Sequence, residues 1–271
     1  MAARSAGRFK AERLFRPESL IVVGAGTQPG RRVLTNIAAA GFGGRVIEAE
    51  TAADIKDVAD LAILAGPTDA AVVLPALAER GCFAAIALGP VEGALPAIRS
   101  TGVRLIGTHA FGIIVPKLGL DASESHLRAQ AGRLALVSQS GGTCRAVLDW
   151  AGPNGVGFSH VIGIGTSVDL GFSAVLDYLS RDPGTGAIVL DIRTIKNPRA
   201  FLSAARAAAR LRPMVAISPG NLLADPSGEA EAAIEAALRR AGVLSVQTIE
   251  DLLAAAETLT HSRPARDDTI A

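Results

Sequence analysis

Cysteine, aromatic residues, net charge and long apolar runs are all scarce in this sequence, and each scarcity argues against a class of protein. Two cysteines in 271 residues cannot supply a disulfide framework, so we expect a reducing compartment, the cytoplasm. Aromatic residues make up only 4% of the chain and its net charge is +1, which argues against nucleic-acid binding. No apolar run approaches the roughly 18 residues of a membrane span, and no histidines and cysteines are spaced as metal ligands.

The rest of the composition is typical of a folded α/β protein. Apolar residues make up 49% and charged residues 20% of the chain, and its 29 glycines suit tight turns. Short apolar stretches that suit buried strands alternate with stretches that suit helices. We predict strands at residues 19–23, 45–49, 61–65, 83–88, 103–106, 134–137, 160–164, 187–192, 214–218 and 243–246. This alternation predicts parallel sheets that are covered by helices.

The alternation is interrupted at residues 107–133, where glycine, proline and a polar DASES run indicate irregular structure. We place a domain junction there. The expected division is a first domain over residues 1–125, a second over residues 126–260, and a disordered tail over residues 261–271. The basic segment up to Arg16 lacks the apolar region of a signal peptide, so we interpret it as a solvated lead-in.

A glycine-rich turn at residues 24–30 follows the first predicted strand and precedes a helix. Its glycines allow a tight turn and a close approach of the backbone to a phosphate, although the turn could also be merely structural. The candidate ligand-binding residues are Gly24, Gly26, Thr27, Gly30, Arg31 and Arg32. The two arginines either contact phosphate oxygens or are solvated. Glu48 and Glu50, about twenty residues later, would suit a ribose diol, which keeps NAD as an alternative ligand.

A second turn of this kind, at residues 138–143, joins the apolar stretch 134–137 to another helix. A strand that enters a helix through such a turn directs several free backbone N–H groups to one point, and the helix dipole adds about half a positive charge. The turn therefore predicts an anion site, for a phosphoryl group or a carboxylate. Its residues are Ser138, Gln139, Ser140, Gly141, Gly142 and Thr143.

The second turn also approximates the nucleophile elbow of serine hydrolases, with Ser138 in the place of a glycine. Such an enzyme needs a histidine–acid pair, and the four histidines are scattered along the chain at 109, 126, 160 and 261. We single out His109, in the loop 107–112, as a candidate catalytic residue, with a structural or solvated histidine as the alternative. Cys144 could be a stabilised thiolate at a helix start, but we expect it to be a packed thiol, like Cys82.

Taken together, these stretches resemble the α subunit, or α region, of NDP-forming acyl-CoA synthetases, which include succinyl-CoA synthetase. LFRPESLIVVGAGTQPG resembles the opening of their CoA-binding domain, and RLIGTHAFGIIVP resembles their GPNCxGxxxP junction. The stretch LALVSQSGGTCRAVLDWAGPNGVGFSHVIGIGTSVDL is similar to the SQSG turn and the G-x-G segment of their second domain. FSAVLDYLSRDPGTGAIVLDIR continues the similarity, which runs colinearly from about Leu14 to Leu259.

The resemblance implies a Rossmann-like CoA-binding domain followed by a flavodoxin-like parallel α/β domain. It implies that CoA or acyl-CoA binds at the turn 24–30. In this family a phosphorylated histidine relays phosphate between the nucleotide and the acid, and it rests against helix N-termini, one of which matches residues 138–143. It also implies an ATP-grasp β-type partner, which would bind ATP or ADP, and a small acid as substrate.

The sequence departs from the family at three places. The family's active histidine lies in a glycine-rich loop that matches SPGNLLADPSGEAE, which is shorter and has no histidine. The glutamate that orients that histidine matches Arg193, which has the opposite charge. In GPNC, His109 replaces the asparagine and Ala110 the cysteine. We also find no ATP-grasp region in these residues.

We therefore expect a CoA-binding α-type subunit of a divergent synthetase, in which His109 would be a replacement phosphate carrier. A non-catalytic sensor of CoA thioesters, or a scaffold, is the first alternative. An NAD(P)-dependent oxidoreductase is the weaker one. We also expect a homo- or hetero-oligomer, and no nucleic acid or membrane among its partners.

Overall fold

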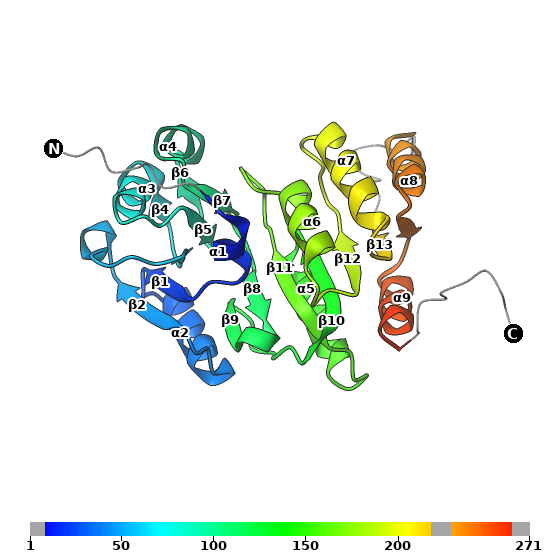
Figure 1. Ribbon diagram of the computed structural model, residues 1–271, viewed down its shortest axis with the longest axis horizontal. Helices are drawn as coiled ribbons and strands as arrows, with labels where there is room; N and C mark the ends of the chain where they lie inside the picture. Colours follow the sequence, from blue (N-terminus) through cyan, green and yellow to red (C-terminus); the bar gives the residue numbers. More distant parts are fainter. Residues whose placement is uncertain (1–8, 218–228, 262–271) are drawn as a thin grey trace, which may run out of the picture.

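A computed structural model describes residues 9–217 and 229–261, and its two large sheets lie side by side (Figure 1). The first sheet is parallel throughout, with the strand order β2-β1-β3-β5-β7. Its strands are β1 (Ser19–Val23), β2 (Arg45–Ala49), β3 (Leu61–Leu64), β5 (Ala84–Ala87) and β7 (Arg104–Ile106). These strands confirm the prediction of a parallel α/β sheet in the first half of the chain.

Helices cover both faces of the first sheet, because its strands carry apolar side chains on both sides. One face packs against α3 (Ala70–Glu79) and α4 (Ala94–Thr101), and the other packs against α1 (Ala11–Phe15) and α2 (Gln28–Ala40). The remaining elements of this half are the 3₁₀ turn η1 (Ala52–Asp54) and the short strand pair β4 (Thr68–Asp69) and β6 (Val91–Glu92).

The second sheet has the strand order β14-β13-β12-β10-β11-β8-β9. Its parallel strands are β10 (Ala131–Ser138), β11 (Phe158–Gly163), β12 (Ala187–Asp191), β13 (Met214–Ile217) and β14 (Leu244–Val246). One face packs against α5 (Gly141–Ala151) and α9 (Ile249–His261), and the other against α6 (Phe172–Arg181), α7 (Pro198–Ala209) and α8 (Glu229–Ala241). Among the described residues, no helix combines the length and apolar character needed to cross a membrane.

An antiparallel hairpin completes the second sheet, where we had predicted irregular structure. It consists of β8 (Gly112–Val115), the 3₁₀ turn η2 (Pro116–Leu118) and β9 (Leu120–Ser123), and β8 pairs with β11. The prediction was wrong because the glycine and proline that seemed to interrupt the chain form the turn of the hairpin, with Gly119 in the left-handed conformation at φ 63°. The hairpin joins the second sheet, although it precedes residue 126. The division into domains stays a prediction.

The lead-in before β1 is also not wholly solvated, contrary to our interpretation. Leu14 and Phe15 of α1 are fully or almost fully buried, and the ring of Phe15 stacks on that of Tyr178 in α6 with centroids 4.4 Å apart. This contact joins residues that are far apart in the sequence, so no local pattern indicates it. Residues 1–8 and most of the expected tail, residues 262–271, lie outside the described residues.

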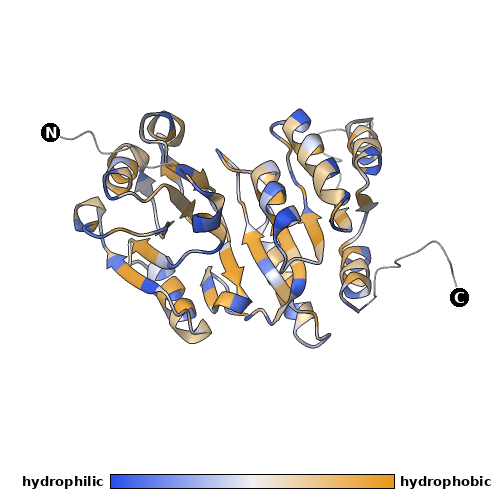
Figure 2. Ribbon diagram, viewed as in Figure 1, coloured by the Kyte–Doolittle hydropathy of each residue, from blue (hydrophilic) through white to orange (hydrophobic). Residues whose placement is uncertain are grey.

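The two halves pack against each other through one continuous apolar cluster. It includes Val22 and Ile86 of the first sheet, Ile113 of the hairpin, and Val137 and Ile162 of the second sheet. Figure 2 shows that most strands of both sheets are hydrophobic, whereas hydrophilic residues are scattered over the helices and loops around them. Burial of a shared cluster fixes the two sheets relative to each other.

Both parallel sets share one topological feature. In each set the first strand lies between the second and the third, since β1 lies between β2 and β3, and β10 lies between β11 and β12. Connections leave the first strand and its neighbour in opposite directions at such a point, which opens a crevice at the carboxyl ends of the strands. The turn 24–30 follows β1 and the turn 138–143 follows β10. The fold therefore places both predicted sites at switch points.

Candidate functional site

Thr27 organises the first turn. It is the N-cap of α2, and its Oγ1 accepts the Gly30 N–H at 3.1 Å. The same oxygen lies within hydrogen-bond distance of two carbonyl oxygens, at 2.7 Å from that of Gly24 and 2.6 Å from that of Ala65. Because Ala65 follows β3, Thr27 joins the ends of the two strands that flank the switch point.

The glycines of this turn are required by close packing. A β-carbon on Gly30 would lie 2.2 Å from the carbonyl oxygen of Gly24 and 2.8 Å from that of Ala25, and Gly24 has a φ of 80°. These contacts involve backbone atoms, which cannot move aside as a flexible side chain can. The start of α2 is therefore pressed against the end of β1, as a nucleotide-binding βα unit requires.

The carboxylate of Glu50 lies against a backbone N–H group of the first turn. The Gly26 N–H donates to Glu50 Oε2 at 3.0 Å, and the guanidinium of Arg31 donates to the carbonyl oxygen of Gly26. Arg32 is exposed on the same helix. A carboxylate of the chain itself thus holds a backbone N–H that a phosphate would use. Glu50 does lie at this turn, as we expected of a ribose-binding acid, but its partner here is the backbone.

The second turn is held by a buried acid that we did not single out from the sequence. Ser138 Oγ donates to Asp191 Oδ2 at 2.6 Å and accepts the Ser140 N–H at 2.9 Å. Asp191 is only 1% exposed and ends β12. A carboxylate that ends an apolar strand beside a switch point is the pattern that could have indicated it. Ser140 is the N-cap of α5, where its Oγ accepts the Thr143 N–H at 3.2 Å.

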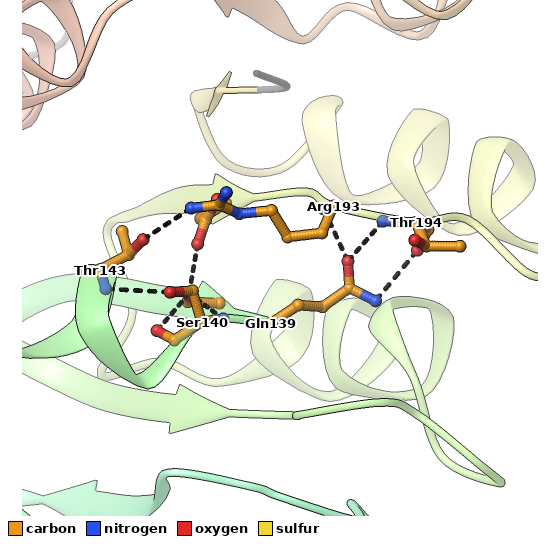
Figure 3. Close-up of polar contacts among 7 residues, drawn as sticks. Gln139, Ser140, Thr143, Arg193 and Thr194 are labelled. Carbon is orange, nitrogen blue, oxygen red and sulfur yellow. Dashed lines mark hydrogen bonds and ion pairs between the residues drawn. The ribbon is translucent and has the colours of Figure 1, made fainter. Parts of the chain in front are cut away.

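Gln139 holds the segment that follows β12 close to this turn through hydrogen bonds to its backbone. Its Oε1 accepts the N–H groups of Arg193 and Thr194 at 2.7 and 2.8 Å, and its Nε2 donates to the Thr194 carbonyl oxygen at 3.0 Å (Figure 3). An amide side chain that pairs with both sides of a backbone segment determines the path of that segment. Gln139 is therefore a positioning residue, since its polar atoms are engaged by the chain.

Arg193 lies at the N-terminus of α5. Its Nε donates to Asp191 Oδ1 at 3.1 Å and its Nη2 to Thr143 Oγ1 at 3.3 Å, while half of its side chain remains exposed (Figure 3). A cation at the positive end of a helix dipole is unfavourable by itself. An anion bound between the guanidinium and the first N–H groups of α5, those of Gly141 and Gly142, would make both favourable.

The loop that carries His109 lies beside the same helix end. Phe111 packs against Gly141, since a β-carbon on Gly141 would lie 3.7 Å from its ring, and the guanidinium of Arg145 lies 5.6 Å from the centroid of that ring. His109 is exposed, has a φ of 52°, and donates its backbone N–H to Gly89 at 3.3 Å. The fold thus brings the loop to the second turn, and the role of the imidazole stays a prediction.

The segment after β11 joins this loop to the second turn. The Thr166 N–H donates to the Thr108 carbonyl oxygen at 2.9 Å, and Arg104 forms a two-pronged ion pair with Asp169 at 2.7 and 2.8 Å. A cavity of about 90 Å³ lies here, between this segment and the residues after β12, and Gln139 and Lys196 are part of its lining. The carboxyl edges of both sheets therefore meet around the second turn.

Neither cysteine contributes a reactive thiolate. Cys144 is fully buried in α5, and burial raises the pKa of its thiol to about 12; Cys82 is in the same state. The described residues contain no cluster of three or more side chains that could hold a metal ion. The segment in which we noted the absence of the family's histidine begins at Ser218, and residues 218–228 lie outside the described residues.

Comparison with known proteins finds relatives that are similar to this chain. Residues 131–259 match the family described as "Succinyl-CoA ligase like flavodoxin domain". The chain is 29% identical to the ADP-forming acetate–CoA ligase I of Archaeoglobus fulgidus, over 94% of the chain and 42% of that protein. It is 23% identical to the α subunit of the ADP-forming acetate–CoA ligase I of Pyrococcus furiosus, over 96% of the chain and 65% of that subunit.

A solved structure agrees with the fold. The dinucleotide-forming acetyl-coenzyme A synthetase 1 of Ca. Korarchaeum cryptofilum, in complex with phosphate and ADP, superposes with a TM-score of 0.83 and 23% identity, over 93% of this chain and 62% of that one. The chain therefore spans less than two thirds of each of these relatives. Residues 131–259 thus match the succinyl-CoA ligase-like flavodoxin domain, and over most of its length the chain is similar to ADP-forming acetate–CoA ligases.

Proposed function

We propose that this chain is the CoA- or acyl-CoA-binding, α-type part of a divergent NDP-forming acyl-CoA synthetase, an acid–thiol ligase, and that it acts with a separate ATP-grasp partner. The observation that carries the proposal is the second turn, in which Arg193, Thr143 and the first N–H groups of α5 converge at a switch point. The curated relatives are named as CoA ligases, and one of them is named as a subunit.

In this proposal the second turn holds an acyl phosphate or the carboxylate of a small acid. The guanidinium of Arg193 and the dipole of α5 both favour an anion there, and Asp191 keeps the guanidinium in place. A positively charged, preorganised cradle stabilises charge that develops on phosphoryl or acyl oxygens. ATP or ADP would bind to the partner.

The first turn holds CoA in this proposal. Its packing brings the backbone within reach of a phosphate, and Arg31 and Arg32 lie at the start of the following helix. Glu50 must release the Gly26 N–H before a phosphate can use it. Glu50 is exposed, so solvent can compensate for the lost contact and the displacement is inexpensive.

A non-catalytic sensor of CoA thioesters is the second candidate, and the departures at the relay favour it. The sequence from Ser218 to Glu231 has no histidine, and Arg193 stands where the family has a glutamate. A phosphoryl relay would therefore need another carrier, for which His109 is our candidate. In the sensor, ligand binding would be retained and no phosphoryl group would be transferred.

Titration calorimetry of the purified chain with CoA, acetyl-CoA and NAD tests ligand binding. We expect CoA and acetyl-CoA to bind, and Gly26→Leu to abolish binding by placing a side chain against the turn. Gly43→Leu is the matched control, because a β-carbon on Gly43 would meet no atom within 4 Å. Failure of CoA to bind contradicts both candidates. Binding of NAD without CoA would instead support the oxidoreductase, for which Glu50 would hold the ribose.

Transfer of radiolabel from γ-labelled ATP distinguishes the synthetase from the sensor. The chain is combined with its co-purified ATP-grasp partner, and label on the chain is followed in wild type and in His109→Asn. Labelling that His109→Asn removes supports the synthetase with His109 as carrier. Labelling that survives this change supports the synthetase with another carrier. Unlabelled protein that still binds CoA supports the sensor.

A further inference from the structure

A cavity of about 320 Å³ lies at the amino edge of the second sheet. Its walls come from the end of α1, the hairpin with η2, the first residues of β11 and the loop between α6 and β12. The second turn lies at the carboxyl edge of the same sheet. The cavity is therefore separate from the site of the proposed function, and an argument about it does not depend on that function.

The buried side chain of His160 lines this cavity, and its ring nitrogens can form hydrogen bonds. It is 3% exposed, and neither of its ring nitrogens has a hydrogen-bond partner among the described residues. Burial lowers its pKa to about 4, although the carboxylate of Asp182, 3.8 Å from Nδ1, opposes the shift. The neutral ring offers one N–H donor and one acceptor. Buried polar groups without a partner are rare in native proteins and indicate an unseen water or ligand.

Two other polar side chains that line the cavity, Asp182 and Ser159, already have hydrogen-bond partners. Asp182 accepts from Thr185 Oγ1 at 2.8 Å and lies 4.0 Å from the guanidinium of Arg16. The hydroxyl of Ser159 pairs with the same threonine at 2.9 Å. Asp182 Oδ2 and the Ser159 hydroxyl thus both have a hydrogen-bond partner. Both nitrogens of the His160 ring, by contrast, lack a hydrogen-bond partner in the described part of the chain.

Charge and apolar surface define what the cavity can accept. The cavity is lined by two cationic side chains, Arg16 and the exposed Lys117, and by one acidic side chain, Asp182. The lining therefore has a net positive charge. Lys117 has no ion-pair partner in the part of the chain that the structure describes. Val115 and Leu118 add an apolar surface. The single net positive charge of the lining matches a monoanion, and a purely polar ion would leave the apolar wall uncovered.

We propose that this cavity is a binding site for a small organic monocarboxylate, whose carboxylate accepts the His160 N–H between Arg16 and Lys117 and whose alkyl part covers Val115 and Leu118. Arg16 lies at the end of α1, which packs on the first sheet, and the other residues belong to the hairpin, to the second sheet or to the loop before β12. A bound carboxylate therefore joins the two halves, and binding stabilises their contact.

The test is titration of the purified chain with acetate, butyrate and inorganic phosphate, followed by the imidazole signals of ¹⁵N-labelled histidine in NMR. His160 is identified as the ring that stays neutral near pH 5. We expect a saturable shift of this signal with butyrate and a higher melting temperature. Two additional methylene groups on the apolar wall should make butyrate bind about tenfold more tightly than acetate.

Two variants and a control complete the test. His160→Phe retains a ring and removes both nitrogens, and we expect it to abolish butyrate binding. Lys117→Met retains an unbranched side chain, removes the charge and should weaken binding about fivefold, whereas Lys56→Met, at another exposed lysine, should not. If His160→Phe fails to fold, the two lysine variants decide. The proposal is overturned if butyrate shifts no signal of His160, if phosphate binds as well as butyrate, or if both lysine variants behave alike.

Discussion

The two glycine-containing turns share a plan and differ in charge. Each follows the first strand of a parallel set, lies at a switch point and begins a helix that a hydroxyl caps, Thr27 in one and Ser140 in the other. At the first turn the side chain that closes over the backbone donors is an acid, Glu50. At the second it is a cation, Arg193, held by a buried acid.

Under the proposed function, this difference separates two kinds of anion site. In the first turn the Gly26 N–H already donates to Glu50, so an anionic ligand must displace this carboxylate. Its binding free energy then includes only the difference between two similar hydrogen bonds. The second turn presents a guanidinium and a helix N-terminus to solvent, so an anion is added without displacing any group of the chain. The first turn should therefore select ligands by shape and by contacts elsewhere, and the second by charge.

The largest expected effect concerns how tightly each turn is packed. Gly30→Val should destabilise the protein by about 3 kcal/mol or more, because its β-carbon would lie 2.2 Å from a backbone oxygen. Gly141→Ala should change stability by less than about 1 kcal/mol, because the closest atom to a β-carbon there, at 3.3 Å, is the guanidinium end of the flexible Arg145. Urea denaturation measures both. Equal losses would mean that the two turns do not differ in packing.

The packing at the first turn could be predicted from the sequence, as could much of the fold. Short apolar stretches are local signals, and the structure confirms the strands that they predict at residues 19–23 and 45–49. The glycine–strand–helix order also predicted where both turns lie.

The rest depends on contacts between distant segments, which local patterns do not contain. The helix α1 packs against Tyr178, which is distant in the sequence. The hairpin that we predicted as irregular structure pairs with β11. Glu50 could be placed near the first turn from its position in the sequence, but its contact with the Gly26 N–H depends on side-chain geometry. The clamp of Asp191 on Arg193 likewise requires the strand order of the second sheet.

A second, smaller effect distinguishes the two acids. Asp191→Ala should cost about 3 kcal/mol, since it removes a buried carboxylate and leaves Ser138 and Arg193 without their partner. Glu50→Gln should change stability by less than about 0.5 kcal/mol, because the Glu50 side chain is exposed and the amide oxygen can still accept the Gly26 N–H. Chemical denaturation of both variants measures the difference. A large loss for Glu50→Gln would show that the first turn also depends on its acid.

Ligand affinity should respond in opposite directions at the two turns. Arg193→Met should weaken binding of acetyl phosphate to the second turn about tenfold, because it removes the cation opposite the helix N-terminus. Glu50→Gln should strengthen CoA binding about threefold, because a neutral side chain no longer repels the phosphate that replaces it. Calorimetry on each variant with both ligands gives its own control, since each change should leave the other ligand unaffected. Weakened CoA binding in Glu50→Gln would instead show that the acid contacts the ligand directly.

The smallest effect concerns the caps, where the two turns should be nearly equal. Loss of an N-cap hydroxyl costs about 1 kcal/mol, so Ser140→Ala and Thr27→Ala should both destabilise by roughly this amount. Thr27→Ala should destabilise slightly more than Ser140→Ala, because the Thr27 hydroxyl also contacts the carbonyl oxygen of Ala65 across the switch point. In the second turn the equivalent contact, to Asp191, is made by Ser138. The double change Ser138→Ala with Ser140→Ala should therefore exceed Thr27→Ala. If it does not, the Ser138–Asp191 bond contributes nothing, and Asp191 acts through Arg193 alone.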